Sequence, residues 1–129
     1  MSQIKIYGLK EHLDPIKARL SDMIHDCVVD TLGLPRDKRA HRFFGLEEED
    51  FYRPATASPR YIILEINMIA GRTTETKKNL IHAIYRRTGA ELGLVSADVE
   101  IQIIESPKAN WGFRGMTGEE IGLPYKIEV

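Results

Sequence analysis

Apolar and polar residues alternate or recur at helical spacing in a fixed order along the first third of the chain. Ile4 to Tyr7 alternates apolar and polar positions, which predicts a short strand. Asp14 before Pro15 is a typical helix start, and Gly33 is a typical helix stop. A helix is predicted between them, with an apolar stripe of Ile16, Leu20, Met23, Ile24, Cys27, Val28 and Thr31.

The second half of the chain repeats this order. Tyr61 to Ile69 is dense in β-branched residues and predicts a strand buried on both faces. Thr73 or Thr74 can cap a second helix that stops at Gly93. Val99 to Ile104 alternates again, which predicts a strand with one wetter face.

Polar or turn-forming segments separate these elements. His41 to Leu46 is predicted to be extended, and the acidic run from Glu47 to Asp50 to be a solvated loop. Arg53 to Arg60 contains two prolines and predicts a connector between the two halves. Tyr125 to Val129, at the end of a tail rich in glycine and aromatic residues, is a candidate edge strand.

The two halves align without gaps at a constant shift of 60 residues. The identical pairs are Ile6/Ile66, Lys17/Lys77, Leu20/Leu80, Ile24/Ile84, Leu32/Leu92, Gly33/Gly93 and Leu34/Leu94. This predicts one domain, residues 1–129, with pseudo-repeats 1–52 and 61–115 and a C-terminal tail, 116–129. Two right-handed β-α-β units make a two-layer α+β fold, a four-stranded sheet with two helices on one face. We expect the other face to pack against further copies of the chain.

The composition suits a single folded domain. The chain has 129 residues, 43% of them hydrophobic, and 18 Lys plus Arg balance 19 Asp plus Glu to a net charge of −1. Nucleic acid and membranes are therefore not expected partners. The one cysteine, Cys27, lies in the first helical stripe and cannot form an internal disulfide. No secretory signal is evident, so the cytoplasm is the expected location, and the scattered histidines predict no metal site.

Three motifs follow the predicted elements in order. They are Gly33-Leu34-Pro35-Arg36-Asp37 after the first helix, Gly71-Arg72-Thr73-Thr74-Glu75-Thr76-Lys77 before the second, and Glu105-Ser106-Pro107-Lys108-Ala109-Asn110-Trp111-Gly112-Phe113 after the last core strand. Together they resemble the tautomerase superfamily, in particular the group that contains malonate semialdehyde decarboxylase. The resemblance covers nearly the whole chain and implies a cofactor-free homotrimer, with an active site near the amino-terminal end of the first strand.

Members of this superfamily commonly use an amino-terminal proline as a base or a cationic acid. Here Met1 is followed by Ser2. If Met1 is removed, the primary amine of Ser2 lies roughly where the proline nitrogen belongs, and it can carry a proton or form a Schiff base. If Met1 is retained, the amine is displaced by one residue. Ser2 is therefore a candidate catalytic residue.

Arginines bind the substrate carboxylate in this superfamily, and Arg72 is the first candidate here. At a strand-to-helix turn its guanidinium can act together with the free N–H groups of the helix. A second arginine of the decarboxylase-like pattern, two residues earlier, is Ala70 in this chain. Asp37 matches a position that orients water or substrate, and it equally suits a turn residue after Pro35.

Five further positions complete the candidate site. His41 could carry a proton in place of the missing proline, and Arg39 beside it supplies a cation. After the last core strand, Trp111 and Phe113 can line a pocket or make an oligomer contact equally well, and Arg114 follows them.

These observations favour a tautomerase-like isomerase. The expected reaction is cofactor-independent proton transfer, either keto-enol tautomerisation or a related hydration or decarboxylation, on a small 2-oxo or unsaturated carboxylic acid. The alternative is a non-catalytic trimer that binds or senses a small carboxylate through Arg72. Nucleic-acid binding on the sheet would need exposed aromatic and basic residues on its strands, whereas Tyr61 to Ile69 offers aliphatic ones.

Overall fold

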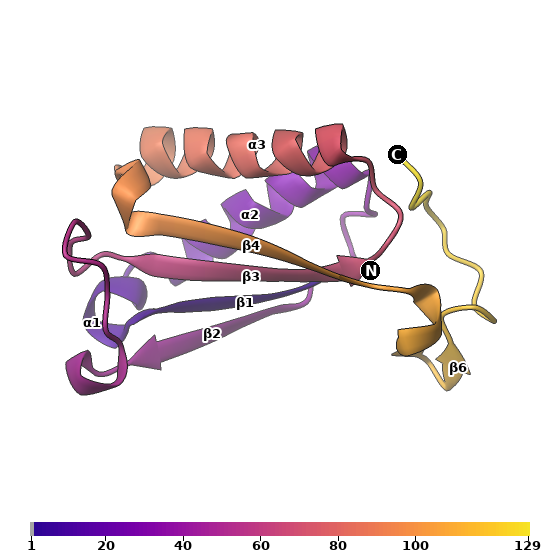
Figure 1. Ribbon diagram of the computed structural model, residues 1–129, viewed down its shortest axis with the longest axis horizontal. Coiled ribbons are helices and arrows are strands. Elements are labelled where there is room, and N and C mark those ends of the chain that lie inside the picture. Colours follow the sequence, from indigo (N-terminus) through magenta and orange to yellow (C-terminus); the bar gives the residue numbers. More distant parts are fainter. Residues whose placement is uncertain (1) are drawn as a thin grey trace.

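Two strand-helix-strand units form one sheet with helices on a single face (Figure 1). The computed structural model describes residues 2–129. The main elements are β1 (Ser2–Leu9), α1 (Lys10–Leu13), α2 (Lys17–Leu32), β2 (His41–Leu46), β3 (Ile62–Ile69), α3 (Thr74–Leu92) and β4 (Val99–Ser106). The shorter ones are η1 (Glu48–Asp50), η2 (Ser96–Asp98), η3 (Lys108–Asn110), β5 (Gly112–Phe113) and β6 (Met116–Thr117).

The strand order of the sheet is β2-β1-β3-β4. Within each unit the two strands are parallel, as β1 is to β2 and β3 to β4. The units join through the antiparallel pair β1 and β3, in which Ser2 pairs with Met68. The amino-terminal end of β1 therefore lies beside the carboxyl-terminal ends of β3 and β4, and the predicted α+β fold is confirmed.

Most of the predicted helix boundaries are confirmed. Thr73 caps α3, because its side chain accepts a hydrogen bond from the Thr76 amide at 3.1 Å. Gly33 and Gly93 end the two long helices at φ values of 69° and 64°, which glycine adopts without steric cost.

The predicted start of the first long helix is wrong. Asp14 follows the separate short helix α1 and does not cap α2, which begins at Lys17 after Ile16. The Asp14 carboxylate instead accepts hydrogen bonds from the ammonium groups of Lys10 and Lys17. These lysines, four residues before and three after it, compete with the helix amides for the carboxylate oxygens.

The apolar core lies between the sheet and the two long helices. Its largest fully buried strand residues include Ile4, Ile6, Leu64 and Ile66. The prediction that β3 is buried on both faces is wrong, because its burial alternates and Glu65 is only half-buried on the other face. The helices cover one face alone, so strand alternation leaves the open face of the sheet partly polar.

The connector between the units covers one end of that open face. Leu9, Phe51 and Tyr61 form a second buried cluster there. The connector is held to the second unit because the Asp98 carboxylate accepts hydrogen bonds from the amide and hydroxyl of Ser58. The acidic run before it is exposed, as expected, but forms the short helix η1 rather than an irregular loop.

The end of the C-terminal tail, residues 125–129, forms no strand, contrary to the prediction for Tyr125 to Val129. It packs across the turn between β3 and α3, where the Val129 carbonyl oxygen accepts hydrogen bonds from the Thr73 amide at 3.0 Å and the Thr76 hydroxyl at 2.8 Å. Ile127 is buried against Gly71. Side-chain packing and helix-end hydrogen bonds thus hold the tail in place of sheet pairing.

The helices of residues 2–129 include none with both the length and the apolar content needed to cross a bilayer.

Two glycine substitutions are predicted to change stability in opposite directions. Gly71→Ala should lower the unfolding free energy by about 1–3 kcal/mol, because φ is +142° and the new Cβ would lie 2.8 Å from Ile127 Cγ2. Gly89→Ala should raise it by roughly 0.5–1 kcal/mol, because the nearest atom to its Cβ in α3 is the Leu94 oxygen at 3.7 Å. Urea unfolding followed by circular dichroism measures both; a stabilising Gly71→Ala would contradict the described turn.

Candidate functional site

Four segments meet at the edge of the sheet where β1 begins. Sheet register brings the start of β1 beside the ends of β3 and β4. The turn that carries Arg72 follows β3, the segment containing η3 and β5 follows β4, and the C-terminal tail packs on the β3–α3 turn. Figure 1 shows the start of β1 and the C-terminal end of the chain at this end of the molecule.

Arg72 is the most unusual side chain at this edge. It is only 5% exposed, and Nη1 donates a hydrogen bond to the Ile69 carbonyl oxygen at 2.9 Å. Nε and Nη2 are also buried, yet they have no hydrogen-bond partner within residues 2–129. Burial lowers the pKa of Arg72, because the charged guanidinium loses solvation. Buried donors without acceptors are costly, so this guanidinium suits an external carboxylate.

Two neighbouring segments supply further buried donors without acceptors. In the described part of the chain, Trp111 Nε1 and the Tyr125 hydroxyl are buried without partners. Trp111 follows η3, and Tyr125 lies in the tail. Ser2, the first residue of β1, is itself 4% exposed. Unsatisfied polar groups are thus concentrated on the segments that surround the amino-terminal end of β1.

A polar hollow of about 370 Å³ opens on the sheet face at this edge. Its lining residues come from all four strands and the segment after β4, and are Gln3, Lys5, Arg42, Asn67, Ser106, Asn110, Trp111 and Gly112. Neither Lys5 nor Arg42 has an ion-pair partner among the described residues, and Arg42 Nη2 donates to Gln3 Oε1 at 3.1 Å. The hollow therefore has two cations and no lining carboxylate, which suits an anionic ligand.

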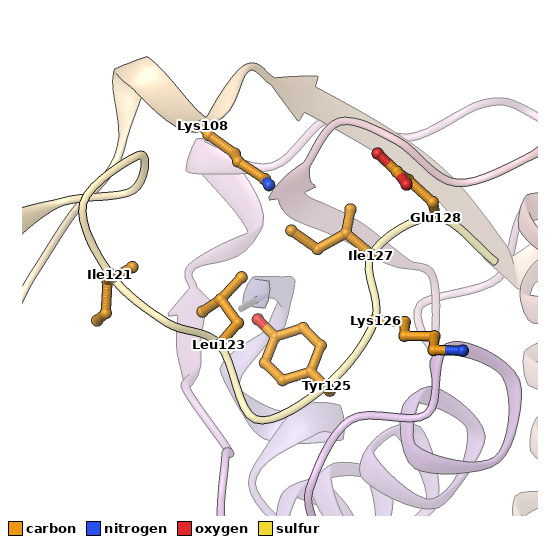
Figure 2. A pocket seen from close by; sticks show the side chains of 7 residues that line it. All are labelled: Lys108, Ile121, Leu123, Tyr125, Lys126, Ile127 and Glu128. Carbon is orange, nitrogen blue, oxygen red and sulfur yellow. The ribbon is translucent and has the colours of Figure 1, made fainter.

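A second hollow, of about 490 Å³, lies beneath the C-terminal tail. It is lined by Lys108, Ile121, Leu123, Tyr125, Lys126, Ile127 and Glu128. Figure 2 shows Lys108, from η3, pointing into the hollow toward Ile127, while Lys126 points away from it. Its mixed lining can hold a small molecule with an apolar body and one negative charge.

Two predicted site residues lie on the helix side of the sheet and not on its open face. His41 pairs with Ile4 on the helix side of the sheet, and its Nδ1 lies 2.8 Å from the Ser21 hydroxyl of α2. Arg39 Nη1 donates to Asp22 of the same helix at 2.6 Å. Arg42 faces the open hollow instead. The sequence feature that indicates the position of Arg42 is the alternation of His41 to Leu46, because neighbouring residues of a strand lie on opposite faces.

The other predicted site residues have separate positions. Asp37 is exposed in the turn where the Lys38 amide donates to the Pro35 carbonyl oxygen at 3.0 Å, before β2. Trp111 stacks on Phe113 with ring centroids 5.5 Å apart, and Arg114 is exposed at φ 50° in the turn after β5. The structure brings Ser2, Arg72 and Trp111 to one edge, and it leaves Asp37 on the turn before the outer strand.

The pseudo-repeat offers a second edge of the same kind, at the amino-terminal end of β3. There the space next to the strand is filled, because Phe51 of the connector and Tyr61 pack against Leu9. Tyr61 is 3% exposed and Phe51 is 8% exposed. At the shift of 60 residues, His12 stands where Arg72 stands in the second unit. The edge at β1 is therefore the better candidate. Within residues 2–129 no cluster of three His, Cys, Asp or Glu side chains is placed to bind a metal.

The buried position of His41 makes the stability of the fold depend on pH. Burial, assisted by the positive charges of His25 and Arg39 and opposed by Asp22, lowers the pKa of His41 to about 4. In the unfolded chain a histidine titrates near 6.5, so between pH 6.5 and 4 the unfolded state binds the extra proton. The contribution of His41 is complete above pH 6.5 and is lost as the pH falls toward 4.

We predict that His41→Asn flattens the decline in unfolding free energy over that interval. The difference in slope should approach, and not exceed, about 1.4 kcal/mol per pH unit. Urea unfolding of both proteins at several pH values between 4 and 7.5 measures it, and the difference isolates His41 from the carboxylates common to both. Parallel curves would show that His41 titrates alike in the folded and unfolded chains.

Comparison with known proteins adds three kinds of similarity. Residues 38–114 match the family described as tautomerase enzyme. Two proteins named 2-hydroxymuconate tautomerase, from Comamonas testosteroni and Pseudomonas putida, are each 38% identical over 58 residues, 45% of this chain and 92% of theirs. The structure of FG41 malonate semialdehyde decarboxylase inhibited by 3-bromopropiolate is 26% identical, with a TM-score of 0.80 over 95% of this chain and 99% of that one.

A fused 4-OT, solved as a wild-type asymmetric trimer, superimposes with a TM-score of 0.78 at 24% identity, over 91% of this chain and 96% of that one. This similarity extends the match in fold through both strand-helix-strand units.

Proposed function

This chain belongs to the tautomerase family, and from that membership we propose that it catalyses cofactor-independent proton transfer on a small 2-oxo or unsaturated carboxylic acid. The observation that carries the proposal is the buried Arg72 guanidinium, whose Nε and Nη2 have no acceptor within residues 2–129. A carboxylate offers two oxygens in the planar arrangement that a guanidinium binds. The similar tautomerases are named for 2-hydroxymuconate, and the similar decarboxylase is inhibited by the unsaturated acid 3-bromopropiolate.

We propose that the amine of Ser2 carries the proton after removal of Met1, which lies outside the described residues. Ser2 begins β1 at the edge that also carries Arg72. An α-amine has a reference pKa of about 7.7–8.0, and both burial and a neighbouring cation favour its neutral form. The amine would accept the enol O–H proton and leave an enolate. The electron pair of the C=C bond would then take the proton back from the ammonium at carbon as the C–O bond becomes a carbonyl, which completes a balanced isomerisation.

The remaining candidate residues are assigned to binding and orientation. Arg42 and Lys5 line the polar hollow and can hold a second negative group, such as the distal carboxylate of a diacid. Trp111 and Phe113 stack beside it as an aromatic wall. Asp37 remains a candidate for orienting water or substrate from its exposed turn, and Arg114 for contacting the ligand from the hairpin after β5.

A second function is favoured by one observation, the serine at the position where this superfamily commonly has proline. Without that rigid secondary amine, the chain could bind or sense a small carboxylate through Arg72 and do no chemistry. Ketonisation of 2-hydroxymuconate at the buffer rate, together with carboxylate binding that depends on Arg72, would select this alternative.

Replacing Arg72 tests both proposals. We predict that Arg72→Gln lowers kcat/KM for ketonisation of 2-hydroxymuconate by at least about tenfold, because a charge-assisted hydrogen bond contributes about 1.5–3 kcal/mol. Arg86→Gln, at an exposed position of α3, is the matched control and should leave the rate unchanged. Ultraviolet absorbance of the enol follows the reaction. Equal activity of both variants and the parent protein would remove Arg72 from the site.

We also propose that the chain forms a homotrimer through the open face of the sheet. Phe44 is 38% exposed on that face and stacks on Tyr7 with ring centroids 4.9 Å apart. Association would bury this aromatic surface, which the helices leave uncovered. The fused 4-OT of similar fold was solved as a trimer.

Light scattering after size-exclusion chromatography should therefore give a mass three times that of the single chain. Phe44→Glu would place a charge in the interface, and it should reduce the mass to that of one chain at micromolar concentration. His82→Glu, at an exposed position of α3, should leave the trimer intact. A monomeric parent protein, or a trimer unaffected by Phe44→Glu, would exclude this face as the interface.

A further inference from the structure

An ion pair joins α3 to β4 beside the turn that carries Arg72. Lys77 Nζ, in the first turns of α3, lies 2.8 Å from Glu105 Oε1 near the end of β4. Both side chains are about three-quarters shielded from solvent. The pair connects two motifs that stand apart in the sequence, since Lys77 ends the Gly71–Lys77 motif and Glu105 begins the one after the last core strand.

Glu105 lies at the level of the sheet where Arg72 is anchored. Arg72 donates to the Ile69 carbonyl oxygen, and Ile69 pairs with Ser106, the residue after Glu105. Strand alternation puts Glu105 on the same face as Ile101 and Ile103, the face that α3 covers. The negative charge of Glu105 acts on Arg72, since it raises the pKa of the guanidinium against the lowering caused by burial.

A buried guanidinium with free N–H groups attracts a carboxylate whose charge acts on it, as that of Glu105 acts on Arg72. Charge-assisted bonds are strongest where solvent is excluded, and a carboxylate on the same chain has a high effective concentration. Such a pair would satisfy the free N–H groups of Arg72, and any ligand carboxylate would then have to displace Glu105. In the structure Glu105 instead contacts Lys77, and two donors of Arg72 stay free within residues 2–129.

We propose that Lys77 is a positioning residue that holds the Glu105 carboxylate away from Arg72 and so keeps the guanidinium available for the carboxylate of a ligand. The proposal rests on the function proposed for Arg72. Lys77 is placed for this role by the start of α3, which Thr73 caps. A purely structural ion pair between α3 and β4 would affect stability, but it would not decide how Arg72 binds a ligand.

Three variants separate these roles: Lys77→Gln, Glu105→Gln and the double variant. Pyruvate serves as the probe, with its binding measured by NMR titration, and 2-hydroxymuconate ketonisation supplies KM. Lys77→Gln should weaken pyruvate binding and raise KM by about tenfold or more, because the released Glu105 competes for Arg72. The double variant should restore both values to within about twofold of the parent protein, because the competing carboxylate is gone.

Lys78→Gln is the matched control, because Lys78 is the adjacent exposed residue of α3. Circular dichroism confirms that each variant is folded. Unchanged binding in Lys77→Gln would overturn the proposal, and so would a double variant as weak as Lys77→Gln. Arg72→Gln, titrated in parallel, separates the two failures. If it binds pyruvate like the parent protein, the proposed function is wrong; if it binds weakly while Lys77→Gln does not, only the role of Lys77 is wrong.

Discussion

The antiparallel pairing of β1 with β3 joins the two strand-helix-strand units into one sheet. Each strand-helix-strand unit forms its own parallel pair, and neither pair alone makes a sheet that could cover two helices. The β1–β3 pair joins them into four strands. Because it is antiparallel, the beginning of the chain lies beside the ends of β3 and β4, where the Arg72 turn follows. The candidate site therefore combines residues from both units.

Burial at this edge gives the polar groups their chemical character. Arg72 is enclosed by the turn, where one N–H group bonds to the backbone and two remain without acceptors in the described chain. The tail closes the same region because Ile127 packs against Gly71 and the Val129 oxygen accepts hydrogen bonds from the Thr73 amide and the Thr76 hydroxyl. A charge so enclosed gains little from water, so a ligand carboxylate competes with few alternatives. Lys77 contributes to this availability because its ammonium forms an ion pair with Glu105, the carboxylate whose charge acts on Arg72.

Much of the fold could be predicted because local patterns and packing agree. Alternation located the strands, and glycine stops located the helix ends at Gly33 and Gly93. The start of α2 could not be found in this way, because lysines on both sides of Asp14 attract its carboxylate. The apolar run of β3 hid its alternation, since apolar residues fill the helix face and also one half-buried position, Ile63, on the open face.

The site was only partly predictable, because some of its positions depend on contacts between residues that are distant in sequence. Arg72 could be identified from the sequence because it lies at a strand-to-helix turn, next to the free N–H groups at the start of the helix. Distinguishing His41 from Arg42 needed the register of β2 against β1, which depends on contacts distant in sequence. The role of the tail depends on where its residues pack, and no periodic pattern in Tyr125 to Val129 indicates that position.

A crystal structure of the protein with a bound small 2-oxo acid, such as pyruvate, would show whether Arg72 binds a ligand carboxylate. We expect a carboxylate whose oxygens lie within about 3 Å of Arg72 Nε and Nη2, at the amino-terminal end of β1. A carboxylate bound elsewhere, with both Arg72 donors satisfied by protein atoms of a neighbouring copy, would contradict it. That result would make Arg72 a structural residue of the assembly.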